Sequence, residues 1–293
     1  MEKELDMISN IDVSVLMSVY NEESHWLIET IESILNQSYR DFEFIIILDN
    51  PLNFELKEII KNYELKDVRV KVLINSENRG LVYSLNKGLK EAKGKYVVRI
   101  DADDIARNDR IEKQIEFLKS NEEYSLIGTN YKMIDESGNI IRDDIKTISN
   151  FSLLKRALKY RNIMCHPSYM FIKDDIINIG GYRQVKFAED YDLVVRLIMN
   201  GKKISNIDER LLYYRVRQNG ISKSNSYVQR LSSYVIQENY IRNNINFDIE
   251  LKEIGSKKYK IKYYKNKIIY KILETVSHIY ESIRRKAWKK GTN

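Results

Sequence analysis

At residues 96–104 the chain runs Tyr96-Val97-Val98-Arg99-Ile100-Asp101-Ala102-Asp103-Asp104, so that a short apolar segment leads directly into three crowded carboxylates. β-Branched and aromatic residues dominate the first five positions, which predicts a buried strand. The aspartates then lie just beyond the carboxyl end of that strand. This stretch therefore predicts a strand that delivers a polar site, and the segments before it indicate which sheet the strand joins.

Three similar apolar runs precede this strand and predict three further strands, at Val13–Val19, Phe42–Leu48 and Val68–Ile74. Between the four strands, apolar residues recur at spacings of three and four, which predicts three amphipathic helices. Strands that alternate with helices in this way are typical of βαβ units. We therefore predict an α/β fold with a mostly parallel sheet and helices on both faces.

Polar clusters follow three of these strands. Tyr20-Asn21-Glu22 follows the first strand, Asp49 follows the second, and Asp101–Asp104 follows the fourth. Ligands of open α/β sheets bind at the carboxyl ends of the strands. The three clusters should therefore meet at one edge of the sheet and form a single site.

The second half of the chain has a less regular pattern. We expect a hairpin turn at Glu136–Asn139, a strand over His166–Phe171, a helix that opens at Glu189-Asp190, short strands at Lys203–Ile207 and Leu211–Val216, and helices from Tyr227 onward. This division predicts one domain over residues 1–225, with halves at about 11–108 and 109–225. A helical extension over 226–293 should follow it.

The composition is that of an ordinary globular protein, with 43% hydrophobic and 31% charged residues. No apolar run approaches the roughly 18 residues that a membrane-spanning helix needs, and the polar N-terminus does not resemble a secretory signal. Cys165 is the sole cysteine, so an internal disulfide is excluded and packing is its expected role. These features predict a cytoplasmic protein.

Positive charge gathers at the C-terminus. Residues 251–293 contain 13 Lys or Arg and three Glu, a net charge of +10, so the rest of the chain carries −3 of the total of +7. This distribution disfavours a globally basic nucleic-acid binder and indicates an anionic partner of the tail. An apolar stripe at helical spacing runs through the tail at Ile261, Tyr264, Ile268, Ile272, Val276, Ile279 and Ile283. Peripheral binding to the anionic inner face of the cell membrane and packing on protein both stay open.

Asp101, Asp103 and Asp104 place three carboxylates within four residues. Their mutual repulsion makes burial costly unless a cation compensates it, and hard divalent ions take oxygen ligands. One interpretation is a magnesium or manganese ion that bridges the protein and a substrate phosphate. The other is a solvated turn that caps the helix near Asp109. The position after a buried strand, opposite two other polar strand ends, favours the metal site.

Several segments, taken in order, resemble motifs of glycosyltransferase family 2. They are the opening strand with its polar end, Val13–Glu22, the run from Asn78-Arg79-Gly80 to Gly94, the loop Ile100–Asp104, and Gly180-Gly181-Tyr182 followed by Glu189–Leu193. The resemblance covers about residues 11–222. It implies a GT-A (Rossmann-like) fold, a nucleotide-diphosphate sugar as donor, a divalent metal, and inversion at the anomeric carbon.

The resemblance also implies roles for single residues of the first half. Tyr20 and Glu22 would line the nucleotide pocket, and Asp49 would contact the base. Asp101 would contact the ribose or donor, and Asp103 would bind the metal.

In the second half, the resemblance implies that Asp190 is the general base, with Glu189 as its nearest rival. His166 would line the acceptor site or serve as a structural histidine. Back in the first half, Arg79 would pair with the diphosphate or remain a solvated turn residue. The family often has a histidine where Arg217 stands. Arginine cannot bind a metal but forms bidentate bonds with phosphate, so we expect Arg217 at the diphosphate and leave the third metal ligand unassigned.

The sequence therefore predicts an inverting, hexosyltransferase-type glycosyltransferase that uses a UDP-sugar by preference. Its acceptor would be a glycan or lipid-linked glycan of bacterial surface polysaccharide synthesis. Two alternatives stay open. One is a nucleotide-sugar-binding module without transferase activity, and the other is a nucleic-acid binder that acts through the basic tail. The chain lacks an aromatic and basic readout motif, so we expect no nucleic-acid partner.

Overall fold

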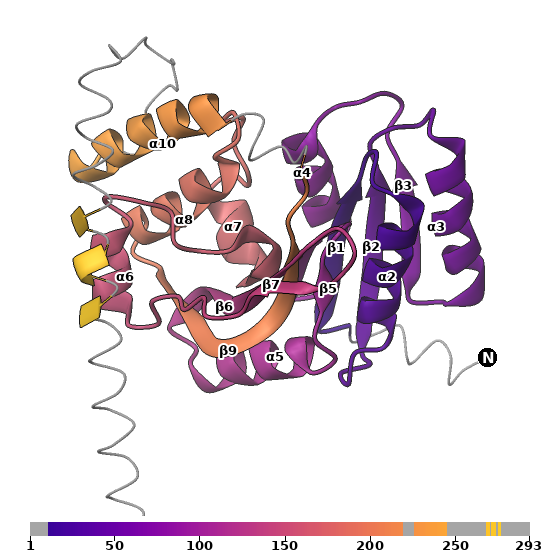
Figure 1. The fold of residues 1–293 in the computed structure, drawn as a ribbon, viewed down its shortest axis with the longest axis horizontal. Coiled ribbons are helices and arrows are strands. Elements are labelled where there is room, and N and C mark those ends of the chain that lie inside the picture. Colours follow the sequence, from indigo (N-terminus) through magenta and orange to yellow (C-terminus); the bar gives the residue numbers. More distant parts are fainter. Residues whose placement is uncertain (1–10, 219–225, 245–267, 270, 274, 277–293) are drawn as a thin grey trace, which may run out of the picture.

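The computed structural model describes residues 11–218, 226–244, 268–269, 271–273 and 275–276. Within these residues, nine strands form one mixed sheet in the order β3-β2-β1-β4-β8-β6-β9-β5, and β7 pairs with β6. Helices cover the sheet from both sides (Figure 1). The predicted α/β architecture is confirmed.

The first half consists of strands in parallel register joined by helices. Its elements are β1 (Val13–Val19), α2 (Ser24–Leu35), β2 (Phe42–Leu48), α3 (Phe54–Lys66), β3 (Val70–Ile74), α4 (Leu81–Glu91) and β4 (Tyr96–Asp101). Strand β1 pairs with β2 on one side and with β4 on the other. The connections therefore change direction at β1, and such a switch point is where open α/β sheets bind their ligands.

Alternating side chains of the central strands feed two hydrophobic clusters, one on each face. Val15 and Met17 of β1 belong to the cluster that contains Ile31 of α2, whereas Leu16 belongs to the cluster that contains Leu85 of α4. Both faces of these strands are thus covered, which explains why they are almost continuously apolar in the sequence. This burial makes the strand ends a rigid support for the site.

The second half adds antiparallel pairs, of β8 with β4 and β6 and of β5 with β9, while β6 and β9 run parallel. Its elements are β5 (Ile105–Ala106), α5 (Arg110–Ser120), β6 (Tyr124–Ile134), β7 (Ile140–Arg142), α6 (Phe151–Ala157), the 3₁₀ helix η1 (His166–Ser168), β8 (Met170–Ile172), α7 (Lys173–Asn178), α8 (Glu189–Met199), β9 (Lys203–Arg215) and α10 (Ser226–Ile241). The sheet as a whole is therefore mixed, and the expected hairpin turn between β6 and β7 is confirmed.

Two strand predictions for this half are wrong. Residues His166–Ser168, with Pro167 at their centre, form η1, and the strand begins at Met170. Lys203–Arg215 forms one continuous strand instead of two, because the polar residues around Glu209 are held by partners outside β9.

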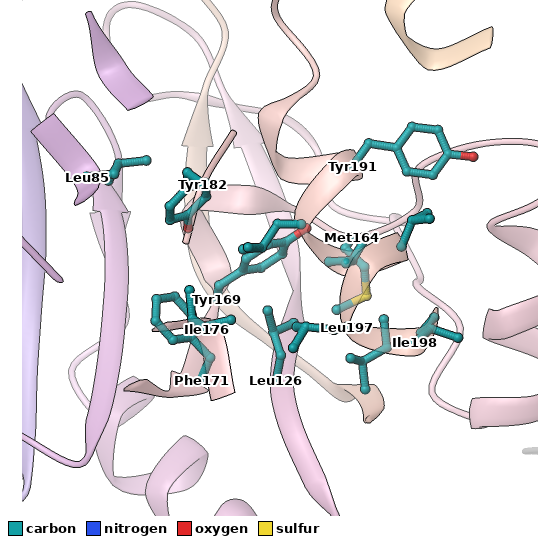
Figure 2. Packing of buried hydrophobic residues seen from close by; sticks show 14 of the residues in the cluster. Leu85, Leu126, Met164, Tyr169, Phe171, Ile176, Tyr182, Tyr191, Leu197 and Ile198 are labelled. Carbon is teal, nitrogen blue, oxygen red and sulfur yellow. The ribbon is translucent and has the colours of Figure 1, made fainter. Parts of the chain in front are cut away.

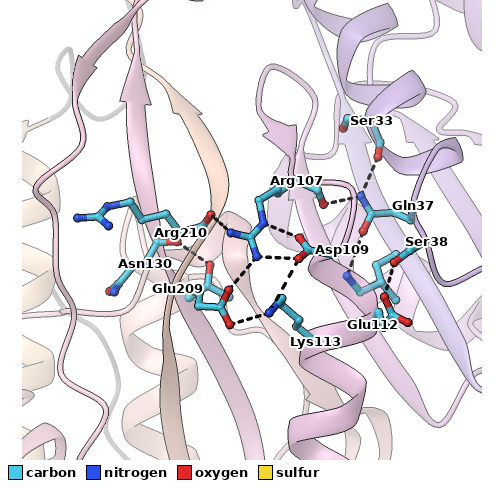
Figure 3. Close-up of polar contacts among 12 residues, drawn as sticks. Ser33, Gln37, Ser38, Arg107, Asp109, Glu112, Lys113, Asn130, Glu209 and Arg210 are labelled. Atoms are coloured by element: carbon cyan, nitrogen blue, oxygen red, sulfur yellow. Dashed lines mark hydrogen bonds and ion pairs between the residues drawn. The ribbon is translucent and has the colours of Figure 1, made fainter. Parts of the chain in front are cut away.

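Figure 3 shows these partners, which surround Arg107 in the segment after β5. Arg107 binds Asp109 and donates to Glu209 at 2.9 Å, and Lys113 of α5 contacts the same Glu209 at 2.8 Å. Gln37, just after α2, donates to the backbone carbonyl of Arg107 at 2.8 Å. This polar network joins the end of α2, α5 and β9. Glu209 is therefore paired, and β9 continues through the position where the sequence pattern predicted a break.

Helix α10 packs on the second half of the domain through Ile236 and Tyr240, which share a cluster with α8. In the tail, Leu273 packs against the same cluster, whereas Ile268, Ile272 and Val276 are 63%, 58% and 46% exposed. The other residues of the predicted stripe lie outside the described residues. None of the described helices is both long and apolar enough to cross a bilayer.

Candidate functional site

Three carboxylates gather where β4 ends beside β1. Asp101, Asp103 and Asp104 each offer an oxygen, and these atoms lie within 4.8 Å of one another. Asp103 and Asp104 are buried, and Asp101 is partly exposed. Burial raises the pKa of Asp103 to about 7, with repulsion from Asp101 adding to the shift. Burial and the two neighbouring carboxylates also raise the pKa of Asp104. A cation would relieve this repulsion.

The end of β9 fixes the shape of this aspartate loop. The backbone N–H of Arg215 donates to Oδ1 of Asp104 at 2.8 Å, and the Arg215 guanidinium donates to the carbonyl of Asp103 at 2.8 Å. Oδ2 of Asp104 is buried and has no hydrogen-bond partner among the described residues. A buried acceptor without a partner is costly, and hard oxygen ligands suit magnesium or manganese. The donor set therefore fits a divalent metal.

Glu22 and Arg217 complete this cluster. The backbone N–H of Tyr20, after β1, donates to Oε2 of Glu22 at 2.7 Å. Burial raises the pKa of Glu22, while Arg217 opposes the shift. Nε of Arg217 lies 2.8 Å from Oδ2 of Asp103. The structure thus brings together four of the predicted residues, which are Glu22, Asp101, Asp103 and Arg217. Arg217 pairs with the carboxylate of Asp103.

Asp49, at the end of β2, organises the loop between β3 and α4. Its Oδ1 accepts from Nδ2 of Asn75 at 2.7 Å and from the backbone of Arg79 at 2.9 Å, and its Oδ2 accepts from the backbone of Gly80 at 2.8 Å. The Arg79 side chain pairs with Glu77 at 2.9 Å. Asp49 therefore holds the loop through three N–H groups, and Arg79 lies on the surface of that loop.

Glu189 and Asp190 are the first two residues of helix α8. Nδ2 of Asn162 donates to Oδ2 of Asp190 at 2.6 Å and orients the carboxylate. Burial raises the pKa of Asp190 to about 6. Burial, followed by repulsion from Asp190, raises the pKa of Glu189. Such shifts are typical of functional carboxylates, whereas an exposed pair at a helix start would lack them.

Asp192, two residues after Asp190, is fully buried and anchors the chain before α8. It pairs with Arg196 at 2.7 Å and with Arg183. Arg196 donates in turn to the carbonyls of Ile179 at 2.7 Å and Gly181 at 2.6 Å. Asp192 therefore holds the Gly180-Gly181-Tyr182 turn against α8.

The same turn is joined to α4 of the first half. Nδ2 of Asn86 donates to the carbonyl of Tyr182, and Oδ1 of Asn86 accepts from its N–H, both at 2.9 Å. Gly181 has φ = +70°, and a Cβ at this position would lie 2.6 Å from Oδ1 of Asn86. Glycine is therefore required both by the backbone conformation and by the close approach.

His166 lies behind this turn. Its Nε2 lies 3.0 Å from the hydroxyl of Tyr182, and its ring packs edge-on against Tyr169. Tyr169 and Tyr182 sit among the buried side chains of Figure 2. Burial lowers the pKa of His166 well below its usual range, so the ring is neutral. These contacts match the structural interpretation of His166 more closely than the acceptor-lining one.

Arg99 is a central residue that the sequence did not single out. Its side chain is 3% exposed and pairs with Asp101, while Nε and Nη1 have no hydrogen-bond partner among the described residues. Its positive charge opposes the upward pKa shifts of Asp103, Glu189 and Asp190. One buried cation thus faces both the aspartate loop and α8. A charge within an otherwise apolar strand was the available signal. Asn162 carried no comparable signal.

Comparison with known proteins identifies the family. The model described as glycosyl transferase family 2 matches residues 14–180. This chain belongs to glycosyltransferase family 2. An uncharacterized glycosyltransferase of Methanocaldococcus jannaschii is 38% identical over 247 residues, with 82% of this chain and 84% of the relative covered. The O-antigen biosynthesis glycosyltransferase WbnJ of Escherichia coli is 34% identical, with 80% of this chain and 89% of the relative covered.

The fold of this family 2 glycosyltransferase also has solved counterparts. The crystal structure of S. aureus TarS 1–349 in complex with UDP-GlcNAc matches with a TM-score of 0.64 and 21% identity. The match covers 82% of this chain and 68% of that chain. The predicted GT-A-like fold is therefore confirmed.

Proposed function

We propose that this glycosyltransferase transfers a hexose from a nucleotide-diphosphate donor, UDP-linked by preference, to a glycan hydroxyl with inversion. One observation carries this proposal. The three carboxylates of the aspartate loop gather at the end of β4, and the buried Arg99 that pairs with Asp101 also interacts electrostatically with Asp190. A carboxylate cluster suited to the donor and a candidate base therefore both interact with one buried positive charge. The TarS structure that matches in fold contains UDP-GlcNAc, which supports the choice of donor.

In this proposal the donor lies along the ends of β1, β2 and β4. Tyr20 and Glu22 line the nucleotide pocket, and Asp101 contacts the ribose or sugar. Asp49 uses three of its roughly four acceptor positions within the protein, which leaves one for an N–H of the base. Arg79 reaches the diphosphate once it leaves Glu77.

Asp103, with its neighbouring carboxylates, would hold a magnesium or manganese ion. Such an ion supplies charge stabilisation to the departing nucleoside diphosphate. Asp190 takes the proton from the acceptor hydroxyl as the new bond forms, on the face opposite the diphosphate. Glu189, next to Asp190, contributes to the surroundings of the acceptor.

The acceptor proposed here is a glycan of surface polysaccharide synthesis, free or lipid-linked. Support comes from the E. coli relative, whose name places it in O-antigen biosynthesis. We further propose that the protein works in the cytoplasm, at the inner face of the membrane. Nucleotide sugars and an anionic lipid surface would both be accessible there.

Ligand-dependent thermal unfolding tests the proposed donor. UDP or a UDP-sugar with manganese should raise Tm by about 5 °C or more at a ligand concentration 100 times Kd, because a ligand that binds the folded state stabilises it. Asp103→Ala should lose the manganese-dependent part of the shift, whereas Asp144→Ala, at a surface ion pair with Arg142, should keep it. No shift with any nucleotide would contradict the proposal.

One activity measurement and one binding measurement separate the proposed transferase from the alternatives. Manganese-dependent hydrolysis of a UDP-sugar that disappears in Asp103→Ala would exclude a module that only binds the nucleotide. Nucleic-acid binding through the tail should be strongest at low salt, so its absence there would exclude the other alternative.

We also propose that the tail contacts an anionic membrane. The exposed side chains of Ile268, Ile272 and Val276 form an apolar row within a strongly basic segment. Basic residues contribute about 1 kcal/mol each near an anionic surface. The full chain should therefore float with phosphatidylglycerol vesicles but not with phosphatidylcholine vesicles. Ile272→Glu should reduce flotation more than Thr275→Glu, which adds the same charge outside the row. Equal flotation of all three proteins would exclude a role for the apolar row, and no flotation of the full chain with anionic vesicles would contradict membrane binding.

A further inference from the structure

Arg217 pairs with Asp103, the residue that we propose as the metal ligand. Its Nε lies 2.8 Å from Oδ2 of Asp103, and the Arg217 side chain is 26% exposed. Its charge also favours the ionised forms of Asp103 and Glu22. Arg217 therefore serves as the counter-ion of the carboxylates around the aspartate loop.

The spacing of the carboxylates makes this role incompatible with simultaneous metal binding. The ligand oxygens of Asp101, Asp103 and Asp104 lie within 4.8 Å of one another, so an ion among them would lie a few ångströms from the guanidinium. Two cations at such a distance repel strongly where water is largely excluded. Asp103 can therefore form a close ion pair with Arg217 or bind a divalent ion, but each interaction weakens the other.

We propose that Arg217 makes metal binding conditional on the nucleotide. Before the nucleotide binds, Arg217 neutralises Asp103. When a nucleoside diphosphate enters, the planar guanidinium exchanges the single carboxylate oxygen for phosphate oxygens, which it can bind in bidentate fashion. Asp103 is thereby released at the moment when phosphate ligands also become available. This inference rests on the proposed donor class and adds an order of binding to it.

The partial exposure of Arg217 is consistent with this exchange. Arg215, two residues earlier, is buried and makes three kinds of contact: with the aspartate loop, with Glu29, and with the carbonyls after β6. Arg217 makes its ion pair with Asp103 at the exposed end of the same segment. Several buried contacts therefore fix Arg215. Arg217 is partly exposed, so rotation of its side chain is enough to break its ion pair with Asp103.

Direct manganese binding tests the proposal without the use of activity. Free Mn²⁺ is measured by electron paramagnetic resonance with the full chain, in the presence and absence of UDP. Without UDP, Arg217→Gln should bind Mn²⁺ about tenfold or more tightly than the wild type, within the roughly 5- to 150-fold range of typical coupling between sites. UDP should then improve Mn²⁺ affinity less in the variant than in the wild type.

A bridging metal without any role for Arg217 predicts a different result. In that case Arg217→Gln would weaken UDP binding and leave Mn²⁺ affinity without UDP unchanged, and this outcome would overturn the proposal. Arg230→Gln removes the same charge from an exposed side chain of α10 that bonds to Ser226, and it should behave as the wild type.

Two further measurements keep the result interpretable. Arg217→Met is a second neutral variant, whose thioether is a poor ligand for the hard Mn²⁺ ion, to be used if Arg217→Gln fails to give a cooperative thermal transition. It should also bind Mn²⁺ more tightly than the wild type without UDP. If UDP with Mn²⁺ fails to stabilise the wild type, the proposed donor class fails. If UDP stabilises the wild type and both neutral variants match its Mn²⁺ affinity, the binding order alone fails.

Discussion

Asp190→Asn should lower kcat for sugar transfer by about a hundred- to ten thousand-fold, the usual contribution of a positioned general base. Asparagine has nearly the same shape and can still accept the hydrogen bond that Asn162 donates at 2.6 Å. It cannot take a proton from an acceptor hydroxyl. The proposed donor site at the aspartate loop should be intact, so UDP should stabilise the variant as much as the wild type.

Glu189→Gln is the matched control, because it removes the neighbouring carboxylate at the start of the same helix. It should cost less activity than Asp190→Asn. A larger loss in Glu189→Gln would transfer the base role to Glu189. A loss of UDP-dependent stabilisation in Asp190→Asn would instead indicate that the substitution disturbs the donor site.

The pH dependence follows from the same carboxylate. Burial raises the pKa of Asp190 to about 6, and a base works only when it is deprotonated. In the wild type, kcat/KM should therefore be level above this pH and fall about tenfold per unit below it. The residual activity of Asp190→Asn should lack this acid limb. The limb should persist in Glu189→Gln at a similar pH, because burial is the main cause of the raised pKa of Asp190.

The sequence predicts the central strands well because both of their faces are buried. Val13–Val19 and Phe42–Leu48 match the observed β1 and β2 to the residue. At the edge of the sheet the pattern is weaker: β3 begins at Val70, two residues later than predicted, and Val68 is fully exposed. An apolar side chain alone does not define a strand end when no neighbouring element covers it.

The site divides in a similar way. Asp101, Asp103 and Asp190 could be found from strand ends and from the family resemblance, because their positions follow local elements. Arg99 and Asn162 could not be found in this way, because their importance depends on neighbours that only folding provides. Asn162, for example, is 28 residues from the carboxylate that it orients. The pairing of Arg217 with Asp103 likewise joins residues from opposite halves of the domain.

Asp192→Asn should be the most destabilising single substitution proposed for this chain. The carboxylate is fully buried and neutralises Arg196, which is 3% exposed, together with Arg183. Removal of one partner from a buried ion pair leaves an uncompensated charge and costs about 3–5 kcal/mol. For a domain of this size the loss corresponds to a decrease in Tm of about 10 °C, measurable by calorimetry or circular dichroism.

The effect should extend to function, because Arg196 also holds the carbonyls of Ile179 and Gly181. Without Asp192 to orient it, the Gly180-Gly181-Tyr182 turn should lose its fixed position against α8, and KM for the acceptor should rise while UDP binding persists. Asp144→Asn removes a carboxylate from an exposed ion pair with Arg142 and should leave Tm unchanged. Asp192→Asn and Asp144→Asn differ mainly in the burial of the carboxylate that they remove. Equal Tm values for these two variants would contradict the predicted stabilisation by Asp192, Arg183 and Arg196.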